Sequence, residues 1–349
     1  MSSIWGSWKR EQKLRQRRKF AILLRLALLA SFFISAVVVG FLVLKVARSS
    51  SLPKNGRATV VFATKPVLLL SFEPQGELTV VSIPEKTYVE ASRGFGSYRI
   101  GVVWELGEQE KLGGELLKET TQEFLGVPVD GWVGSENGKT RESAFLRNWK
   151  MENGKEEILS LKNKLTSWAI LIRPKELLNF GKNLKTNLTI FDLARVWLRA
   201  KFTRFDKINF LDLGQTTALS SLILADGSTA KTFDQALLDA VCLGLFKDSR
   251  FSNEHIAVEV LNGTEKQGLA NRVARVVTNL GGEVVSVANS PQKASRCQIR
   301  GESQFLKSFT GQRLGQIFGC IILPEKPHDS RADIQILIGE DYWQKLYQR

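Results

Sequence analysis

The sequence predicts an α/β protein in which one N-terminal transmembrane helix precedes two α/β domains, the second a small β-α-β-α-β unit. An uncharged run of 19 residues at 26–44 follows a dense basic segment. In the remaining chain, apolar runs of strand length alternate with amphipathic segments of helix length, which is typical of α/β folds. We therefore expect a basic cytoplasmic tail (1–19), a transmembrane helix (20–46), a linker (47–56), an α/β domain (57–247), a second linker (248–255) and a C-terminal domain (256–345).

The uncharged run indicates a membrane anchor. As a helix its 19 residues would span about 28 Å, close to the hydrocarbon core of a bilayer. The run exceeds the roughly 7–15 apolar residues of a signal-peptide core, although the serines at 49–51 resemble a cleavage site. We interpret it as an uncleaved anchor rather than a cleaved signal peptide or a buried core helix. Because basic residues mark the cytoplasmic side, the sequence predicts a single-pass protein of the cell membrane with extracytoplasmic C-terminal domains.

The positive charge is concentrated beside this run. Residues 1–50 contain ten Lys or Arg and one Glu, so they carry +9 of the net charge of +14. The other 299 residues carry only +5 and contain no dense basic stripe. The lipid bilayer is therefore the expected partner of the basic tail, and no nucleic-acid partner is expected.

The few cysteines and histidines limit the chemistry of the chain. Cys242, Cys297 and Cys320 are too few for a disulfide framework, and their neighbours predict buried, inert thiols. His255 and His328 are the two histidines, and neither belongs to a Cys/His cluster or a nucleophile motif. We therefore expect no metal, no cofactor and no catalytic triad.

The first α/β domain begins with two apolar runs, 66–72 and 77–83, which flank a Pro- and Gly-containing turn and predict a hairpin. Thr189 and Asp192 form a capping-box pattern that opens a helix. Ile190 should lie on the apolar face of that helix, and Asp192 and Arg195 on the solvated face. The other expected elements are strands at 58–64, 127–133 and 168–172 and helices at 114–125, 189–201 and 232–246.

The C-terminal domain has the clearest pattern. A strand at 256–261 leads through a turn to a helix that Gly281 and Gly282 end. The turn, at 262–268, precedes a helix N-terminus, where phosphate can bind, but it matches neither common phosphate-loop motif. We interpret it as a tightly packed turn. The remaining expected elements are strands at 283–288, 320–323 and 333–338 and a helix between 302 and 318.

Several motifs of this domain occur together in order. Val258-Glu259-Val260-Leu261-Asn262-Gly263-Thr264 and Gly268-Leu269-Ala270 precede the Gly281-ended helix, and the domain closes with Ala332-Asp333, an apolar strand and Gly339-Glu340-Asp341. Over about residues 255–345 the pattern resembles the LytR C-terminal domain of envelope proteins. That domain often accompanies a LytR–CpsA–Psr domain, which moves wall polymers from a polyprenyl-pyrophosphate lipid to peptidoglycan. The resemblance implies the motif residues Asn262, Gly263, Thr264, Gly268, Asp333, Gly339 and Asp341.

Residues 57–247 resemble a degenerate LytR–CpsA–Psr domain. The segment 67–84 is similar to its central hairpin, and Ser-Ile-Pro-Glu-Lys-Thr at 82–87 stands where the family has Ser-Ile-Pro-Arg-Asp-Thr. Tyr-Arg-Ile-Gly at 98–101 stands near its Lys-Ile-Asn segment. Residues 113–130, which end in Leu-Gly-Val-Pro-Val-Asp, are similar to its helix and Leu-Gly-Ile-Pro-Ile-Asp strand entry.

Two residues differ from that family at positions that hold the pyrophosphate and the metal ion. Glu85 occupies the arginine position and would repel a pyrophosphate. Lys86 occupies the aspartate position and cannot ligate Mg²⁺. The replaced positions favour a protein without catalytic residues or enzymatic activity. Arg93 and Arg99 remain as candidates for a reduced anionic pocket, with solvated surface arginines as the alternative reading.

The expected membrane anchor, the motifs of the C-terminal domain and the replaced residues at 85 and 86 are considered together. They predict a membrane-anchored extracytoplasmic cell-envelope protein. We expect a non-catalytic binding or scaffold module in cell-wall assembly or maintenance, with peptidoglycan, another wall polymer or envelope proteins as partners. The alternative is a divergent phosphotransferase that attaches a polyprenyl-pyrophosphate-linked polymer to peptidoglycan. A transcriptional role would need a cytoplasmic DNA-binding domain, and a tail of about 25 residues is too short to form one.

Overall fold

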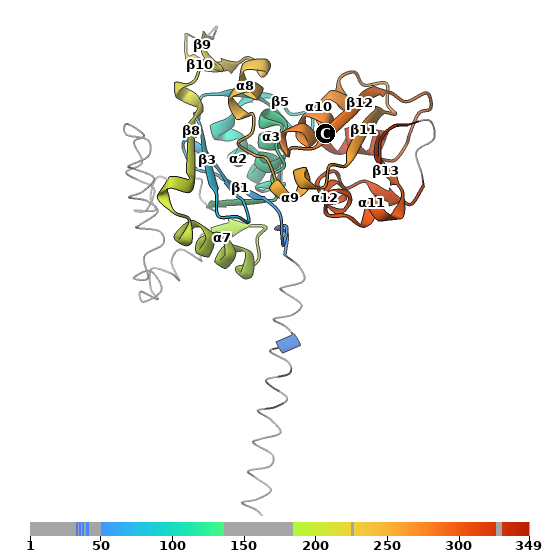
Figure 1. The fold of residues 1–349 in the computed structure, drawn as a ribbon. Coiled ribbons are helices and arrows are strands. Elements are labelled where there is room, and N and C mark those ends of the chain that lie inside the picture. Colours follow the sequence, from blue (N-terminus) through green and yellow to red (C-terminus); the bar gives the residue numbers. More distant parts are fainter. Residues whose placement is uncertain are drawn as a thin grey trace, which may run out of the picture. The chain divides into compact units, whose positions relative to one another are not determined.

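The computed structural model describes residues 50–135, 184–224, 227–325 and 330–348, together with five helical residues between 33 and 41 (Figure 1). The chain divides into the units Met1–Ser50 and Ser51–Arg349. None of the helices among the described residues is long and apolar enough to cross a membrane. The expected basic tail, most of the expected transmembrane helix, the strand expected at 168–172 and His328 lie outside the described residues.

Two separate mixed sheets carry the unit Ser51–Arg349. The first has the order β7-β6-β1-β2-β3-β8. The hairpin predicted at 66–83 is confirmed, because β2 and β3 pair antiparallel from Val67 opposite Ile83 to Phe72 opposite Leu78. β1 is antiparallel to β2, whereas β6 and β8 run parallel to β1 and β3. The strands are β1 (Ala58–Phe62), β2 (Val67–Phe72), β3 (Leu78–Ile83), β6 (Gly131–Ser135), β7 (Leu184–Thr186) and β8 (Ile208–Asp212).

Helices cover both faces of this sheet because its central strands bury alternate residues on opposite sides. Val61 and Val81 face the larger core, which α2 (Ile100–Gln109) and α3 (Glu115–Leu125) close with residues such as Leu117. Val60 and Val80 face the opposite side, where α7 (Ile190–Phe202) packs. Further elements are the hairpins β4–β5 (Tyr88–Ala91, Gly96–Arg99) and β9–β10 (Leu219–Ile223, Thr229–Phe233), the helix α8 (Gln235–Cys242) and the 3₁₀ turns Phe205–Lys207 and Leu213–Gln215.

Helix α7 begins as predicted, but Ile190 and Asp192 lie on the sides opposite to those expected for them. The hydroxyl of Thr189 accepts from the Asp192 backbone N–H at 3.2 Å, and the Asp192 carboxylate accepts from the Thr189 N–H at 3.1 Å, so the capping box is confirmed. However, Asp192 is fully buried and Ile190 is 73% exposed. The carboxylate also accepts from the Ser51 N–H at 3.3 Å. Asp192 therefore lies on the inner side of the helix, where its carboxylate also holds the chain at Ser51.

Two boundaries differ from the prediction. The helix expected from Thr232 begins at Gln235, since Thr232 belongs to β10 and Asp234 provides the cap through its carboxylate. Residues 248–255, expected as a linker, contain the short helix α9 (Ser249–Asn253). Asp248 caps it and is fully buried, and Phe251 belongs to the core of the second sheet. The segment between the sheets is thus itself packed.

The second sheet has the order β12-β11-β15-β13-β14. Its neighbouring strands are parallel except for β13, which runs antiparallel to β15. The predicted strands and first helix are present, but β13 and α13 were not predicted. The helix expected between 302 and 318 is two helices, because Ser308 breaks it and caps the second. The elements are β11 (Ala257–Asn262), α10 (Leu269–Asn279), β12 (Glu283–Asn289), β13 (Gln298–Gly301), α11 (Ser303–Lys307), α12 (Phe309–Phe318), β14 (Ile321–Leu323), β15 (Ile334–Ile338) and α13 (Glu340–Tyr347).

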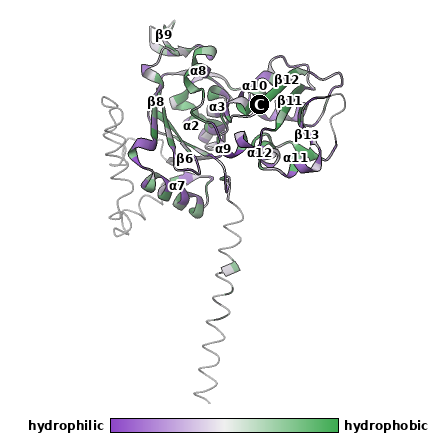
Figure 2. Ribbon diagram, in the orientation of Figure 1, coloured by the Kyte–Doolittle hydropathy of each residue, from purple (hydrophilic) through white to green (hydrophobic). Residues whose placement is uncertain are grey.

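The two sheets keep separate hydrophobic cores. The larger core of the first sheet and the core of the second have no buried residue in common. Figure 2 shows apolar residues along strands of both regions, whereas α7 carries apolar and polar residues side by side. Several polar groups connect the two regions, and they are described below.

Candidate functional site

The segment 82–87, which resembles the Ser-Ile-Pro-Arg-Asp-Thr motif, ends in a turn after β3. The Thr87 N–H donates to the Pro84 carbonyl at 3.0 Å and closes the turn. The carbonyl of Glu85 accepts from the Gly101 N–H, and that of Lys86 accepts from the Lys231 N–H, both at 3.0 Å. Both side chains are exposed to solvent. Glu85 and Lys86 therefore contribute backbone carbonyls to the fold, while their charges face water.

A small cavity lies next to this turn, between the end of β1 and helices α2 and α3. Its volume is about 10 Å³, which is enough for about one water molecule. The charged side chains on its wall are Lys65 and Glu105, whose Nζ and Oε1 atoms are 3.0 Å apart. The lining consists of Ala63, Thr64, Lys65, Val67, Ile100, Gly101, Trp104, Glu105, Leu117 and Ser135. Pockets for drug-sized ligands are roughly 300 Å³ or larger, so this one is too small for a lipid chain.

The structure separates the two candidate arginines. Ala91 pairs with Gly96 at the turn of the β4–β5 hairpin, and Tyr88 pairs with Arg99 at its other end. Arg93 lies in the turn, with a positive φ of 61°. Its guanidinium donates to both carboxylate oxygens of Glu119, at 2.7 and 2.9 Å. These hydrogen bonds raise the pKa of Arg93, so its charge already has a partner.

Arg99 is the less satisfied of the two. Its Nη2 donates to the Ser228 hydroxyl at 2.8 Å. Its Nε is buried without a hydrogen-bond partner. The two arginines nonetheless lie at opposite ends of one hairpin, so the hairpin does not bring them together.

The described residues contain no group of three or more His, Cys, Asp or Glu side chains that could hold a metal ion. His255 has a positive φ of 49°, and its backbone N–H donates to the Ser252 carbonyl. It lies between α9 and β11, so its backbone takes part in the turn into the second sheet.

The motif residues after β11 order a loop. The Oδ1 atom of Asn262 accepts from the Thr264 backbone N–H at 3.0 Å and from the Thr264 hydroxyl at 2.8 Å, and its Nδ2 donates to the Lys266 carbonyl at 2.8 Å. A Cβ atom on Gly263 would come within 2.8 Å of the Ile338 carbonyl oxygen. Gly268 has a φ of 79°, which favours glycine. The loop is thus held by its own side chains, while residues 265–268 are exposed.

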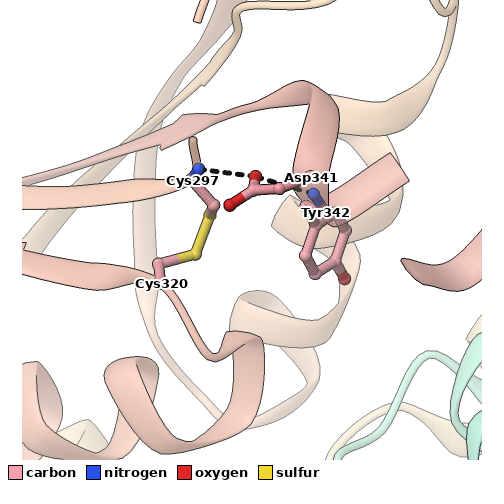
Figure 3. The surroundings of a disulfide bond; sticks show 4 residues. All are labelled: Cys297, Cys320, Asp341 and Tyr342. Atoms are coloured by element: carbon pink, nitrogen blue, oxygen red, sulfur yellow. Dashed lines mark hydrogen bonds between the residues drawn. A yellow bond between two sulfur atoms is a disulfide. The ribbon is translucent and has the colours of Figure 1, made fainter. Parts of the chain in front are cut away.

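The closing motif binds β11, β13 and β15 to one another. The Asp333 carboxylate accepts from the Ala257 N–H at 3.0 Å, and the Ala257 carbonyl accepts from the Asp333 N–H at 2.9 Å. The Oδ1 of Asp341 accepts from the backbone N–H groups of Cys297 and Tyr342, each at 2.7 Å (Figure 3). A Cβ on Gly339 would come within 2.2 Å of the Arg296 carbonyl carbon. These motif residues therefore support the fold.

One prediction about the cysteines was wrong. Cys297 and Cys320, predicted as buried thiols, form a disulfide that joins the start of β13 to the start of β14 (Figure 3). Their 23-residue separation hid the pairing, because the two neighbouring parallel strands that bring them together are recognisable only in the fold. Cys242 is a buried free thiol as predicted, and burial raises its pKa to about 11.

Sequence reasoning missed the polar contact between the two sheet-bearing regions. The Arg313 guanidinium of α12 donates to both oxygens of Asp130, at 2.7 and 3.1 Å. Asp130 ends the Leu-Gly-Val-Pro-Val-Asp motif. At the start of that motif, the Asn279 side chain donates to the Gly126 carbonyl at 2.9 Å, and Arg275 donates to the Phe124 carbonyl at 3.0 Å. The motif was visible in the sequence, but its partners were not.

A second polar cluster extends this contact. Arg57, 4% exposed at its side chain, lies 3.0 Å from Glu73, and its Nε donates to the Lys247 carbonyl. The Arg57 N–H donates to the Asp248 carboxylate at 2.7 Å. Burial lowers the pKa of Arg57 and raises that of Glu73. The chain between the two sheets is thus held at the ends of the central strands β1 and β2 of the first sheet.

Comparison with known proteins identifies the second region. Residues 255–342 match the family described as LytR cell envelope-related transcriptional attenuator. This match confirms the LytR C-terminal domain expected at about 255–345. No curated protein matches the chain.

Solved structures also match about half of the chain. TagV of B. subtilis is 17% identical, with a TM-score of 0.40, over 54% of this chain and 95% of TagV. TagU of B. subtilis is 16% identical, with a TM-score of 0.38, over 53% and 93%. TagT bound to LIIa-WTA is 19% identical, with a TM-score of 0.37, over 54% and 88%. These neighbours are LytR–CpsA–Psr family proteins.

Proposed function

We propose that this chain is a membrane-anchored, extracytoplasmic protein of the cell envelope that binds a wall polymer or an envelope protein and does not transfer polymer. The LytR C-terminal domain at 255–342 supports the envelope role. The uncharged run at 26–44 and its basic flank support the anchor. The Cys297–Cys320 disulfide supports an extracytoplasmic position, because disulfides persist mainly in oxidising compartments.

The observation that carries the non-catalytic part is the small cavity beside the β3 turn. It has room for about one water molecule, and its Lys65 and Glu105 are already paired. A transferase must hold a pyrophosphate with several cations or a metal ion. The nearby Glu85 side chain has the wrong charge for that task, and Lys86 faces solvent. Binding, with no covalent chemistry, is therefore the function that the site supports best.

A sedimentation assay tests the binding role. Full-length protein in detergent micelles is mixed with insoluble wall material, and the fraction that sediments is measured. We expect retention that soluble wall fragments compete away. Absence of retention, together with absence of a protein partner after cross-linking in cells, would contradict the proposal.

A transfer assay tests the absence of catalysis. Purified full-length protein is incubated with a polyprenyl-pyrophosphate-linked polymer and Mg²⁺, and phosphate-containing products are measured. We expect no product from the natural protein or from the E85R/K86D variant, which restores the family residues, because the cavity remains too small. Mg²⁺-dependent product from the natural protein would favour the alternative function, a divergent phosphotransferase.

A further inference from the structure

Helix α7 presents an apolar face to solvent. Ile190 and Phe202 are 73% and 69% exposed, and Phe191 and Leu198 are also exposed. Phe191, Leu198 and Phe202 are seven and then four residues apart, so they line one side of the helix. We call these four residues the α7 outer face. The outer side of a surface helix is normally polar, so this face is unusual for a protein surrounded by water.

Packing fixes which side of the helix points outward. Asp192 is fully buried and holds the capping box. The inner residues Leu193, Val196 and Ala200 pack against the face of the first sheet that carries Val60 and Val80. Because the inner side is occupied by these contacts, the helix cannot rotate to hide the outer face without losing them.

Basic and aromatic groups surround the outer face. Between residues 190 and 207 the chain has five Lys or Arg and two Asp, of which Asp192 is buried and Asp206 pairs with Arg204 at 3.2 Å. The Nζ of Lys201 lies 4.9 Å from the centre of the Trp197 ring. Phe205, 46% exposed, follows in the next turn. Exposed Phe and Leu beside Lys and Arg are typical of helices that lie in the headgroup region of an anionic membrane.

The chain that leads to the anchor is attached to this helix. The Ser51 hydroxyl donates to the Asn187 carbonyl at 3.3 Å, and the Arg195 guanidinium donates to the Pro53 carbonyl at 2.9 Å. Four residues, 47–50, separate this attachment from the end of the expected transmembrane segment. Such a length of chain reaches roughly 14 Å at most. A protein anchored by residues 20–46 therefore keeps α7 near the bilayer surface.

We propose that the α7 outer face inserts into the headgroup region of an anionic lipid bilayer, beside the anchor. The inference rests on the proposed membrane anchor. The apolar side chains enter the interface, while Lys201 lies level with the lipid phosphates.

Lipid quenching of a site-specific probe tests this contact. Full-length F202C protein is labelled with an environment-sensitive fluorophore and placed in nanodiscs that contain anionic lipid. Cys242 is buried and the other cysteines are disulfide-bonded, so the label reports position 202. Q304C, at an exposed residue of α11, is the matched control, and L198C is a second probe on the outer face. We expect headgroup-nitroxide lipids to quench the labels at 202 and 198 at least twofold and the label at 304 hardly at all, with weaker quenching in zwitterionic discs.

The other outcomes overturn the inference in distinguishable ways. Unquenched labels on protein that co-elutes with the discs would reject the α7 contact and leave the anchor intact. A blue-shifted label that lipids do not quench, at one chain per disc, would show that another segment of this chain covers the face. A blue shift that appears only with two chains per disc would identify a second copy as the occupant. Protein that does not co-elute with discs would overturn both the anchor and the α7 contact.

Discussion

Arg313 of the LytR C-terminal domain donates two hydrogen bonds to the carboxylate of Asp130, which lies 183 residues earlier at the end of the Leu-Gly-Val-Pro-Val-Asp motif. The side chains are 2% and 6% exposed. Asp130 also accepts from the Thr59 N–H at 2.9 Å. One buried carboxylate therefore connects β1, the entry to β6 and helix α12.

Removing the arginine should destabilise the protein strongly. The R313M variant leaves the Asp130 charge buried with only the Thr59 N–H as a partner, and loss of one member of a buried pair costs about 3–5 kcal/mol. Urea unfolding of the full chain in micelles measures the difference. K293M, which removes an exposed lysine paired with Glu265, should leave the unfolding midpoint unchanged. Equal midpoints for R313M and K293M would show that the buried pair does not hold the two regions together.

Asp341 should stabilise the fold, because its carboxylate accepts hydrogen bonds from two backbone N–H groups. In D341A the N–H groups of Cys297 and Tyr342 lose their carboxylate partner, which should cost about 1–3 kcal/mol. D341N keeps one acceptor oxygen and should cost less. E340A changes the adjacent acidic residue, whose backbone N–H makes the bond to Ala294, and is the control. The order of the three thermal midpoints checks the prediction, which fails if D341A melts at the same temperature as E340A.

The cysteines predict a thiol count. The native protein should show no reactive thiol, because Cys242 is buried and burial raises its pKa to about 11. Denaturation without reductant should expose one thiol per chain, and denaturation with reductant three. Replacing both Cys297 and Cys320 with serine should lower the free energy of unfolding by about 3 kcal/mol, since the bond closes a loop across 23 residues of sequence. Three thiols without reductant would contradict the disulfide.

Glu254 should make the free energy of unfolding depend on pH at acidic pH. Burial alone would raise the pKa of this carboxyl, but hydrogen bonds from the Thr310 and Phe309 N–H groups outweigh burial and lower it. A carboxyl with a lowered folded pKa stabilises the fold above its unfolded pKa of about 4.3, and this contribution is lost as pH falls through the folded value. Unfolding free energies between pH 5 and 3 should therefore decline less steeply for E254Q than for the natural protein. Parallel curves would contradict this role, and E283Q, which keeps Glu254, should retain the natural slope.

Local signals in the sequence predicted much of the fold. The β2–β3 hairpin, the Thr189–Asp192 capping box and the Gly281 helix end were all recognisable, because each depends on residues a few positions apart. The β4–β5 hairpin was missed, since its short strands carry few of the apolar residues on which strand prediction depends. The side of α7 on which Asp192 lies was predicted wrongly, because the contact of its carboxylate with the Ser51 N–H, 141 residues away, is not visible in the sequence.

The sequence by itself determined the match to the LytR C-terminal domain and the charge asymmetry between residues 1–50 and the rest of the chain. These features depend on residue identity and short spacing. Only the tertiary structure decided that Arg93 pairs with Glu119, that Cys297 and Cys320 are bonded, and that Arg313 meets Asp130. Each of these contacts joins residues far apart in the chain. Strand pairing brings the two cysteines together, whereas the packing of helices α3 and α12 against other elements brings the charged pairs together.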